Sequence, residues 1–167
     1  FYSIDPGYRG KSGEISTQYS NLQMCDEKFY IPENLYIIGT MNDIDRSVDS
    51  FDFAMRRRFR FIEIKADATT GMLDGLRSNR LDDAANELLP EKAINRMTAL
   101  NEAILEVEDL NENYQIGASY FLKLKNLTFD ELWTDCLRPL LQEYVQGLYD
   151  EEGIMKKFAT AYGYIES

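Results

Sequence analysis

The sequence predicts an α/β chain that is mainly helical, with strands in the first 65 residues and helices after them. Leu35 to Ile38 is a short run of large apolar side chains closed by Gly39, the pattern of a strand buried on both faces, and such strands occur mainly in parallel sheets. A second strand is predicted over Phe59 to Ile64. A short helix over Ser50 to Met55 lies between the two strands, and a crossover of this kind joins parallel strands.

The amino-acid composition excludes several classes of protein and of site. The hydrophobic fraction of 44% is enough for a core, and no apolar run approaches the roughly 18–20 residues that a membrane span needs, so we expect no membrane partner. The chain has no histidine, which excludes histidine bases and histidine metal ligands within it. Cys25 and Cys136 fit no metal or redox spacing, so we expect reduced thiols and a cytoplasmic location.

Charge divides the chain. Residues 1–65 hold 10 acidic and 9 basic residues, whereas residues 66–167 hold 19 acidic and 9 basic residues. We therefore predict two domains, 1–65 and 66–167. The second is a poor candidate for contacting nucleic acid, because such binding depends on cations that displace counterions.

The remaining elements follow from local patterns. Residues 1–28, with a strand from Ile15 to Tyr19, are predicted to form a hairpin or an insertion beside the sheet, and Lys28 to Ile31 a short strand or an extended entry. Pro90 suits the first turn of a helix. An amphipathic helix is expected after it, from apolar residues at helical spacing: Ile94, Met97, Leu100, Ile104 and Val107.

Two further helices follow in the predicted helical domain. Thr128 and Glu131 have the spacing of a capping box before an apolar run, and Pro139 within that run predicts a kink or a break. A last helix is expected around Ile154 to Tyr162.

The candidate site begins directly after the first predicted strand. Thr40, Asn42 and Asp45 follow it at once, and ligands of open α/β sheets bind beyond the carboxyl ends of the strands. Five arginines then occur within fifteen positions: Arg46, Arg56, Arg57, Arg58 and Arg60. Two interpretations stay open for them, namely phosphate binding through planar guanidinium groups and stabilisation of the end of a short helix.

Several motifs occur in a fixed order along the chain. They are Phe29-Tyr30-Ile31-Pro32-Glu33-Asn34, Met41-Asn42-x-x-Asp45-Arg46-Ser47, Ala54-Met55-Arg56-Arg57-Arg58-Phe59, Ile116-Gly117-x-Ser119-Tyr120-Phe121 and Pro139-Leu140-Leu141-x-Glu143-Tyr144. With this ordered set the chain resembles the C-terminal part of McrB-type AAA+ nucleotidases. These are motor subunits of modification-dependent, 5-methylcytosine-specific restriction systems. The resemblance runs from about Gln18 to Tyr149.

The resemblance implies a fold and site roles. The fold would be the C-terminal part of an AAA+ P-loop α/β subdomain, followed by an α-helical lid. Asn42 would be the sensor asparagine and Asp45 its acidic companion, while Arg57 and Arg58 fall where the family carries its arginine finger. Thr40, Asn42 and Ser119 would contact nucleotide.

The resemblance also implies substrates and partners. The whole protein would hydrolyse GTP or ATP with Mg²⁺ in a ring, presumed from the family to be a hexamer. It would drive DNA restriction with a McrC-type nuclease, and DNA would bind through regions outside this chain. No Gly-x-x-x-x-Gly-Lys-Ser/Thr loop and no acidic magnesium motif occur here, and the chain begins at Phe1. We therefore expect a fragment that neither binds nucleotide tightly nor hydrolyses it alone.

Two alternatives remain open. One is an AAA+ ATPase of the remodelling or chaperone type, which a different upstream domain would distinguish. The other is a non-enzymatic acidic interaction domain, in which Arg57 and Arg58 are dispensable for turnover.

Overall fold

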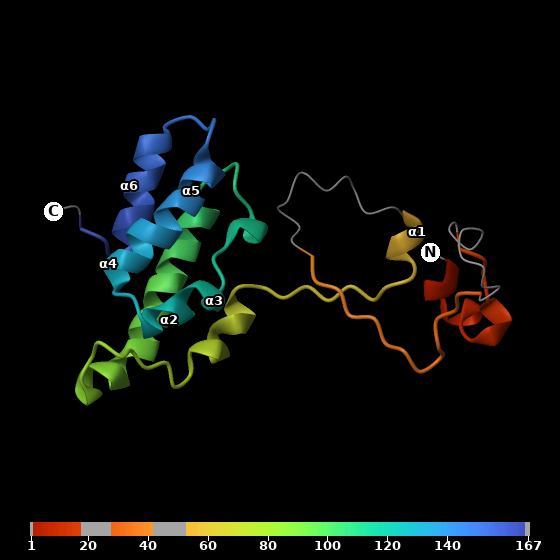
Figure 1. The fold of residues 1–167 in the computed structure, drawn as a ribbon. Coiled ribbons are helices and arrows are strands. Elements are labelled where there is room, and N and C mark those ends of the chain that lie inside the picture. The colour runs from red at the N-terminus through yellow and green to blue at the C-terminus, as the bar shows by residue number, and fades with distance from the viewer. Residues whose placement is uncertain (1, 18–27, 42–52, 166–167) are drawn as a thin grey trace. The chain divides into compact units, whose positions relative to one another are not determined.

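The computed structural model describes residues 2–17, 28–41 and 53–165, which divide into two units, Phe1–Ile62 and Glu63–Ser167 (Figure 1). Among these residues the regular structure is helical, and the only strand-like pairing is an isolated bridge. The mainly helical character predicted from sequence is thus confirmed for the described part of the chain. None of its helices is long and apolar enough to cross a membrane.

The first unit has little regular structure. Three short 3-10 helices, Tyr2–Ile4, Pro6–Tyr8 and Lys11–Gly13, open the chain, and α1 covers Phe53–Arg56. Ile15 and Phe29 form the antiparallel bridge, and each amide donates to the other residue's carbonyl at 2.9 Å. Within the described residues the predicted strands Ile15–Tyr19 and Lys28–Ile31 are thus reduced to this single bridge, and residues 18 and 19 lie outside the described residues.

The two predicted strands are not formed. Leu35–Thr40 and Phe59–Ile64 have no regular secondary structure, and the parallel crossover is absent from the described residues. The side chains of Tyr36 and Ile38 are 90% and 93% exposed, the opposite of the burial that the sequence predicts. A strand needs backbone hydrogen bonds to a neighbouring strand, and no described residue offers them to either segment.

The second unit is built on α2, Asp83–Leu105. The carboxylate of Asp82 caps this helix by accepting from the amide of Ala85 at 2.8 Å. The prediction that Pro90 opens the helix is wrong, because the helix begins seven residues earlier and Pro90 lies inside it. The predicted apolar face is confirmed: Met97, Leu100 and Ile104 are all at most 1% exposed.

Short elements make up much of the rest of this unit. They are the 3-10 helices Asp67–Leu73, Glu112–Tyr114 and Leu122–Lys125, and the helices α3 (Ala118–Phe121) and α4 (Phe129–Leu132). Two of them, the 3-10 helix Asp67–Leu73 and α3, contact α2. The predicted capping box starts α4. The Thr128 amide donates to the Glu131 carboxylate at 2.7 Å, and the Glu131 amide donates to Thr128 Oγ1 at 3.2 Å.

The predicted irregularity at Pro139 takes the form of a π-helical turn. Trp133–Leu137 is π-helical and joins α4 to α5, Arg138–Val145. Proline has no N–H and its ring clashes with the carbonyl four residues earlier, so it disfavours regular α-helical geometry at that point. The wider turn, in which the Arg138 amide bonds the Trp133 carbonyl, accommodates the ring.

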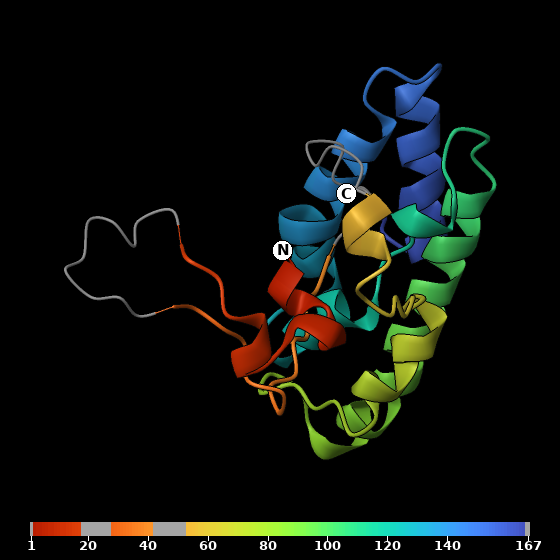
Figure 2. The same cartoon turned by 90° about the vertical axis from the view of Figure 1, so that its right-hand side faces the viewer.

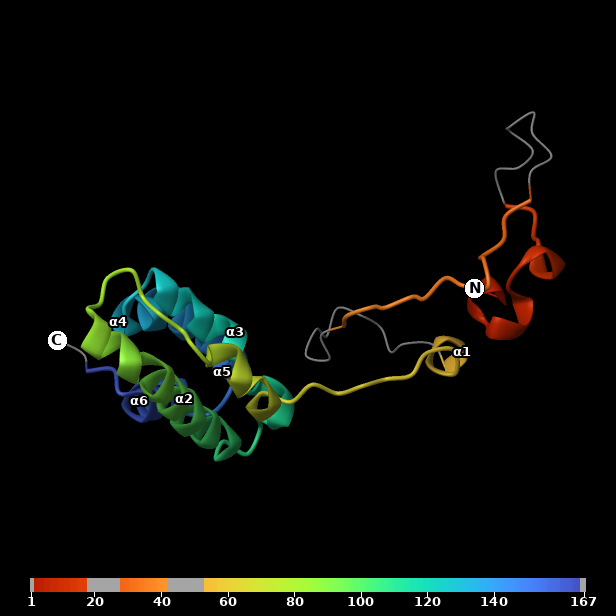
Figure 3. The same cartoon turned by 90° about the horizontal axis from the view of Figure 1, so that it is seen from below.

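The last helix, α6, covers Glu151–Tyr162 and packs along α2 and α5 (Figures 1 and 2). The view from below shows α2 and α6 side by side (Figure 3). Trp133 is 1% exposed, and its ring stacks on Tyr162 at 5.2 Å and on Tyr164 at 5.7 Å. These aromatic contacts fix the C-terminal residues against the π-helical turn.

Candidate functional site

The sequence-predicted site residues fall in both units, and each unit is considered by itself. In the first unit Thr40 is exposed and has no regular secondary structure. Asn42 and Asp45 lie outside the described residues. Their predicted roles therefore stay predictions.

The arginine cluster surrounds the end of α1. Arg57 directly follows the helix and is exposed, whereas Arg58 is half-buried and its guanidinium donates to the carbonyl oxygen of Ala54 one turn earlier. Arg56 lies 5.9 Å from the ring centre of Phe61. Arg58 thus stabilises the helix C-terminus, in line with one of the two interpretations of the cluster, while Arg57 presents its guanidinium to solvent.

In the second unit the motif around Ser119 forms the start of α3. Ile116, Ala118 and Phe121 point into the core and are at most 1% exposed. Gly117 is the N-cap of α3, and Ser119 is exposed. Within the described part of the chain no hydrogen bond is formed by the Ser119 hydroxyl, so the motif buries its apolar residues and leaves this hydroxyl at the surface.

Two side chains from distant parts of the unit hold this motif. Asn101 of α2 accepts from the Ile116 amide at 2.7 Å and donates to the Ile116 carbonyl at 2.9 Å. Thr69 Oγ1 accepts from the Ala118 amide at 3.1 Å and donates to the Ala66 carbonyl at 2.6 Å. Gly117 has no side chain with which to cap α3, and Thr69 supplies the missing oxygen.

Aromatic side chains flank the motif. The Lys123 ammonium lies 5.3 Å from the ring centre of Tyr120 and 3.3 Å from Cys136 Sγ. The rings of Tyr114 and Tyr144 meet edge to face at 5.0 Å. Burial raises the pKa of Tyr144 to about 12, with smaller contributions from Tyr120 and Tyr114, so its hydroxyl keeps its proton at neutral pH.

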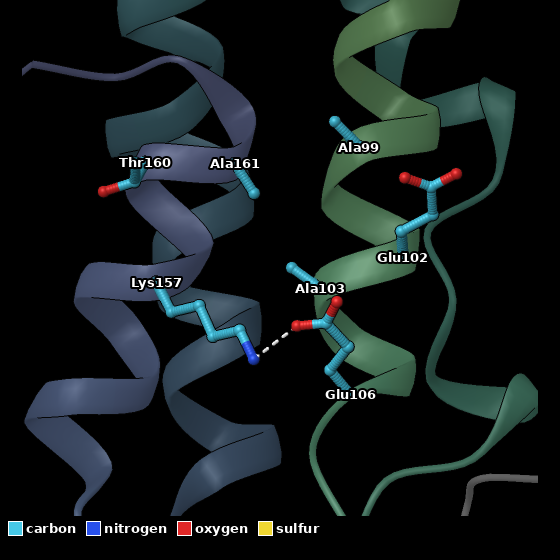
Figure 4. Close-up of a pocket in the computed structure, with 7 residues that line it drawn as sticks. All are labelled: Ala99, Glu102, Ala103, Glu106, Lys157, Thr160 and Ala161. Atoms are coloured by element: carbon cyan, nitrogen blue, oxygen red, sulfur yellow. Dashed lines mark ion pairs between the residues drawn. The ribbon is translucent and has the colours of Figure 1, made fainter.

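A shallow hollow lies between α2 and α6 (Figure 4). It is lined by Ala99, Glu102, Ala103, Glu106, Lys157, Thr160 and Ala161. An ion pair of 2.5 Å between Lys157 and Glu106 crosses it. None of the predicted site residues lines this hollow, and its carboxylates do not suit a phosphate ligand.

The described residues contain no group of three or more Asp, Glu, Cys or His side chains that could hold a metal ion. This part of the chain does not fit Mg²⁺, and we derive no chemical step through the metal.

Asn101 and Thr69 were not predicted as site residues. Asn101 carries a detectable signal, because it is a polar residue within the apolar face that Met97 and Ile104 mark. No local sequence pattern points to Thr69, because its hydrogen-bond partner Ala118 is 49 residues away in the chain.

Comparison with known proteins agrees with the helical second unit. Residues 92–153 match the family model described as McrB, alpha-helical lid domain. Over 144 residues the chain is 36% identical to the Type IV methyl-directed restriction enzyme EcoKMcrB subunit of Escherichia coli strain K12. That alignment covers 81% of this chain and 30% of the relative, so the chain spans less than a third of the relative's length. The chain is therefore of McrB type, and its residues 92–153 are the alpha-helical lid domain of that family.

Proposed function

We propose that this chain is the C-terminal portion of a McrB-like AAA+ nucleoside triphosphatase, which hydrolyses GTP or ATP in a ring and drives DNA restriction with a McrC-like nuclease. The observation that carries the proposal is the 36% identity, over 144 residues, to a methyl-directed restriction enzyme subunit. The first unit would belong to the AAA+ α/β subdomain and the second would be its lid.

The exposed apolar segments of the first unit support this assignment. Ile38 is 93% exposed and Ile62 is 71% exposed, although isoleucine is among the most often buried residues. We propose that other residues of the whole protein cover these segments and complete the subdomain. DNA would also bind through those other residues.

Arg57 and Arg58, which the resemblance gives as candidates for the arginine finger, differ in their surroundings. Arg58 is half-buried and bonded to its own helix, so its guanidinium already has a local role. Arg57 is exposed and carries the role better. Phosphoryl transfer spreads negative charge over the phosphoryl oxygens, and an arginine from a neighbouring subunit that stabilises this charge is worth about 10³–10⁵ in rate in well-studied cases.

The proposal is tested by GTP and ATP hydrolysis in the full-length protein, alone and with the nuclease subunit. Arg57→Ala should lower kcat at least tenfold without lowering the unfolding temperature. Arg60→Ala is the matched control, because it removes an exposed arginine from the same segment. Equal turnover in all three proteins would refute the role of Arg57, and no turnover in the wild type under any condition would refute the nucleotidase.

Action between subunits has its own test. Arg57→Ala and Asn42→Ala should each be weakly active alone. A mixture of the two should regain turnover, because an intact Arg57 of one subunit then reaches a site with an intact Asn42 in its neighbour. A mixture no more active than its components would show that Arg57 does not act across the interface.

A further inference from the structure

Asn101 is a buried polar residue on the core side of α2. Its side chain is 6% exposed, and both ends of its amide bond the backbone of Ile116, at 2.7 and 2.9 Å. Two parallel hydrogen bonds to one residue fix the plane and the direction of that backbone, which a single bond or apolar packing does not. The amide therefore sets the orientation of the chain just before Gly117.

Thr69 fixes the same backbone two residues later. Its Oγ1 accepts from the Ala118 amide and donates to the Ala66 carbonyl, so the hydroxyl has a defined orientation. Asn101 and Thr69 approach the segment from different elements, α2 and the 3-10 helix Asp67–Leu73. Together they hold both sides of Gly117.

The backbone segment that Asn101 and Thr69 hold leads directly to one exposed hydroxyl, that of Ser119. Ile116 and Ala118 are buried, and the next residue, Ser119, is exposed. The polar contacts of Asn101 and Thr69 hold the backbone of Ile116 and Ala118, and so they fix the position from which the Ser119 side chain extends.

A second buried asparagine of α2, Asn86, holds a backbone segment in the same way and serves as a comparison for Asn101. Asn86 is also 6% exposed, and its amide bonds the backbone of Ser78 at 2.7 and 3.2 Å and that of Leu81 at 3.0 Å. The chemistry is the same as at Asn101. The segment held by Asn86 contains none of the predicted site residues, so it provides a matched comparison within one helix.

We propose that Asn101 and Thr69 are positioning residues that fix the Ser119 hydroxyl for nucleotide hydrolysis. This proposal rests on the proposed function and on the expectation, implied by the family resemblance, that Ser119 contacts the nucleotide. Neither side chain touches the nucleotide; each acts through the backbone of residues 116–118. Misplacement of a contacting group by about 1 Å costs as much as 10²-fold in rate, so the loss of either contact is measurable.

The test compares Asn101→Ala with Asn86→Ala in the full-length protein. Both changes remove one buried amide from α2 and should lower the unfolding temperature by similar amounts. Only Asn101→Ala should lower kcat at least fivefold. Thr69→Val removes the Oγ1 at nearly constant volume and should lower kcat in the same way, whereas Thr69→Ser keeps the oxygen and should restore turnover.

A double-mutant cycle with Ser119→Ala decides whether the effect passes through Ser119. Asn101→Ala should lower kcat in the wild type and have no further effect in the Ser119→Ala background. An additive loss, or equal losses in Asn101→Ala and Asn86→Ala, would overturn the positioning role while the nucleotidase stands. A wild-type protein without turnover would overturn the proposed function, and this proposal with it.

Discussion

Replacing Tyr162 by phenylalanine removes one hydroxyl from the core of the second unit and leaves the ring in place. Tyr162 is fully buried, and its hydroxyl donates to the Phe129 carbonyl at 2.8 Å. The carbonyl is not orphaned by the change, because the Trp133 amide also donates to it. The cost is therefore that of one ordinary hydrogen bond, about 1 kcal/mol, rather than that of a buried unpaired acceptor.

The ring contacts of Tyr162 survive the substitution. Trp133 still stacks on the ring, and the Arg96 guanidinium still lies over it at 5.2 Å. A loss of about 1 kcal/mol lowers the unfolding temperature of a domain of 60–100 residues by about 4–8 °C. Trp133 is the sole tryptophan of the chain and is buried beside Tyr162, so its fluorescence reports this unfolding directly.

The control is Tyr149→Phe. Tyr149 is 97% exposed, and the same change there should alter stability by less than about 0.5 kcal/mol. Equal unfolding temperatures for Tyr162→Phe and Tyr149→Phe would refute the hydrogen bond to Phe129. A loss above about 3 kcal/mol would show that the hydroxyl does more than the geometry assigns to it.

Three further outcomes are expected. Thr128→Ala should destabilise the lid by about 1 kcal/mol in guanidinium unfolding, because the capping box with Glu131 is lost, and Thr128→Ser should retain most of that energy. Gly117→Ala should raise the unfolding temperature, with a gain in stability of about 0.4–1 kcal/mol. The φ of Gly117 is −82°, which alanine also adopts, and the new Cβ would lie at an ordinary contact distance of 3.8 Å from Thr69 Oγ1. A marked loss of stability would contradict this. The pKa of Tyr144 is raised by burial from 10.0 to about 12, so the folded state keeps a proton that the unfolded state loses. Stability should therefore fall between pH 10 and 12, and fall less in Tyr144→Phe when unfolding is measured across that range.

The lid could be predicted because its signals are local. The apolar spacing from Met97 to Ile104, the capping box at Thr128 and the break before Pro139 each depend on residues within one or two helical turns. The prediction that Pro90 opens α2 was made because proline favours the first turn of a helix. The Asp82 carboxylate supplies a competing start signal earlier in the chain, and tertiary packing keeps the helix intact through the proline.

The first unit could not be predicted in the same way. The run from Leu35 to Ile38 predicts a buried strand, but burial and strand hydrogen bonds depend on neighbours that no local pattern specifies. Of the candidate site, the sequence could single out the motif that contains Ser119, which the structure places in α3. It could not predict the contact between Thr69 and Ala118, because that contact forms only when the lid folds around α2.

The charge of the second unit limits what it can contact. Four of its cations are already paired with carboxylates, namely Lys65 with Glu112, Arg77 with Asp83, Arg80 with Glu131 and Lys157 with Glu106. All four pairs are largely exposed, and such pairs contribute at most about 1 kcal/mol each, so their main effect is to neutralise positive charge on a domain that has few positive residues. Because binding to DNA depends on cations that replace counterions along the phosphates, this surface is unsuited to it. If the whole protein binds DNA, as the proposed function has it, we expect the contacts with DNA to lie outside this unit.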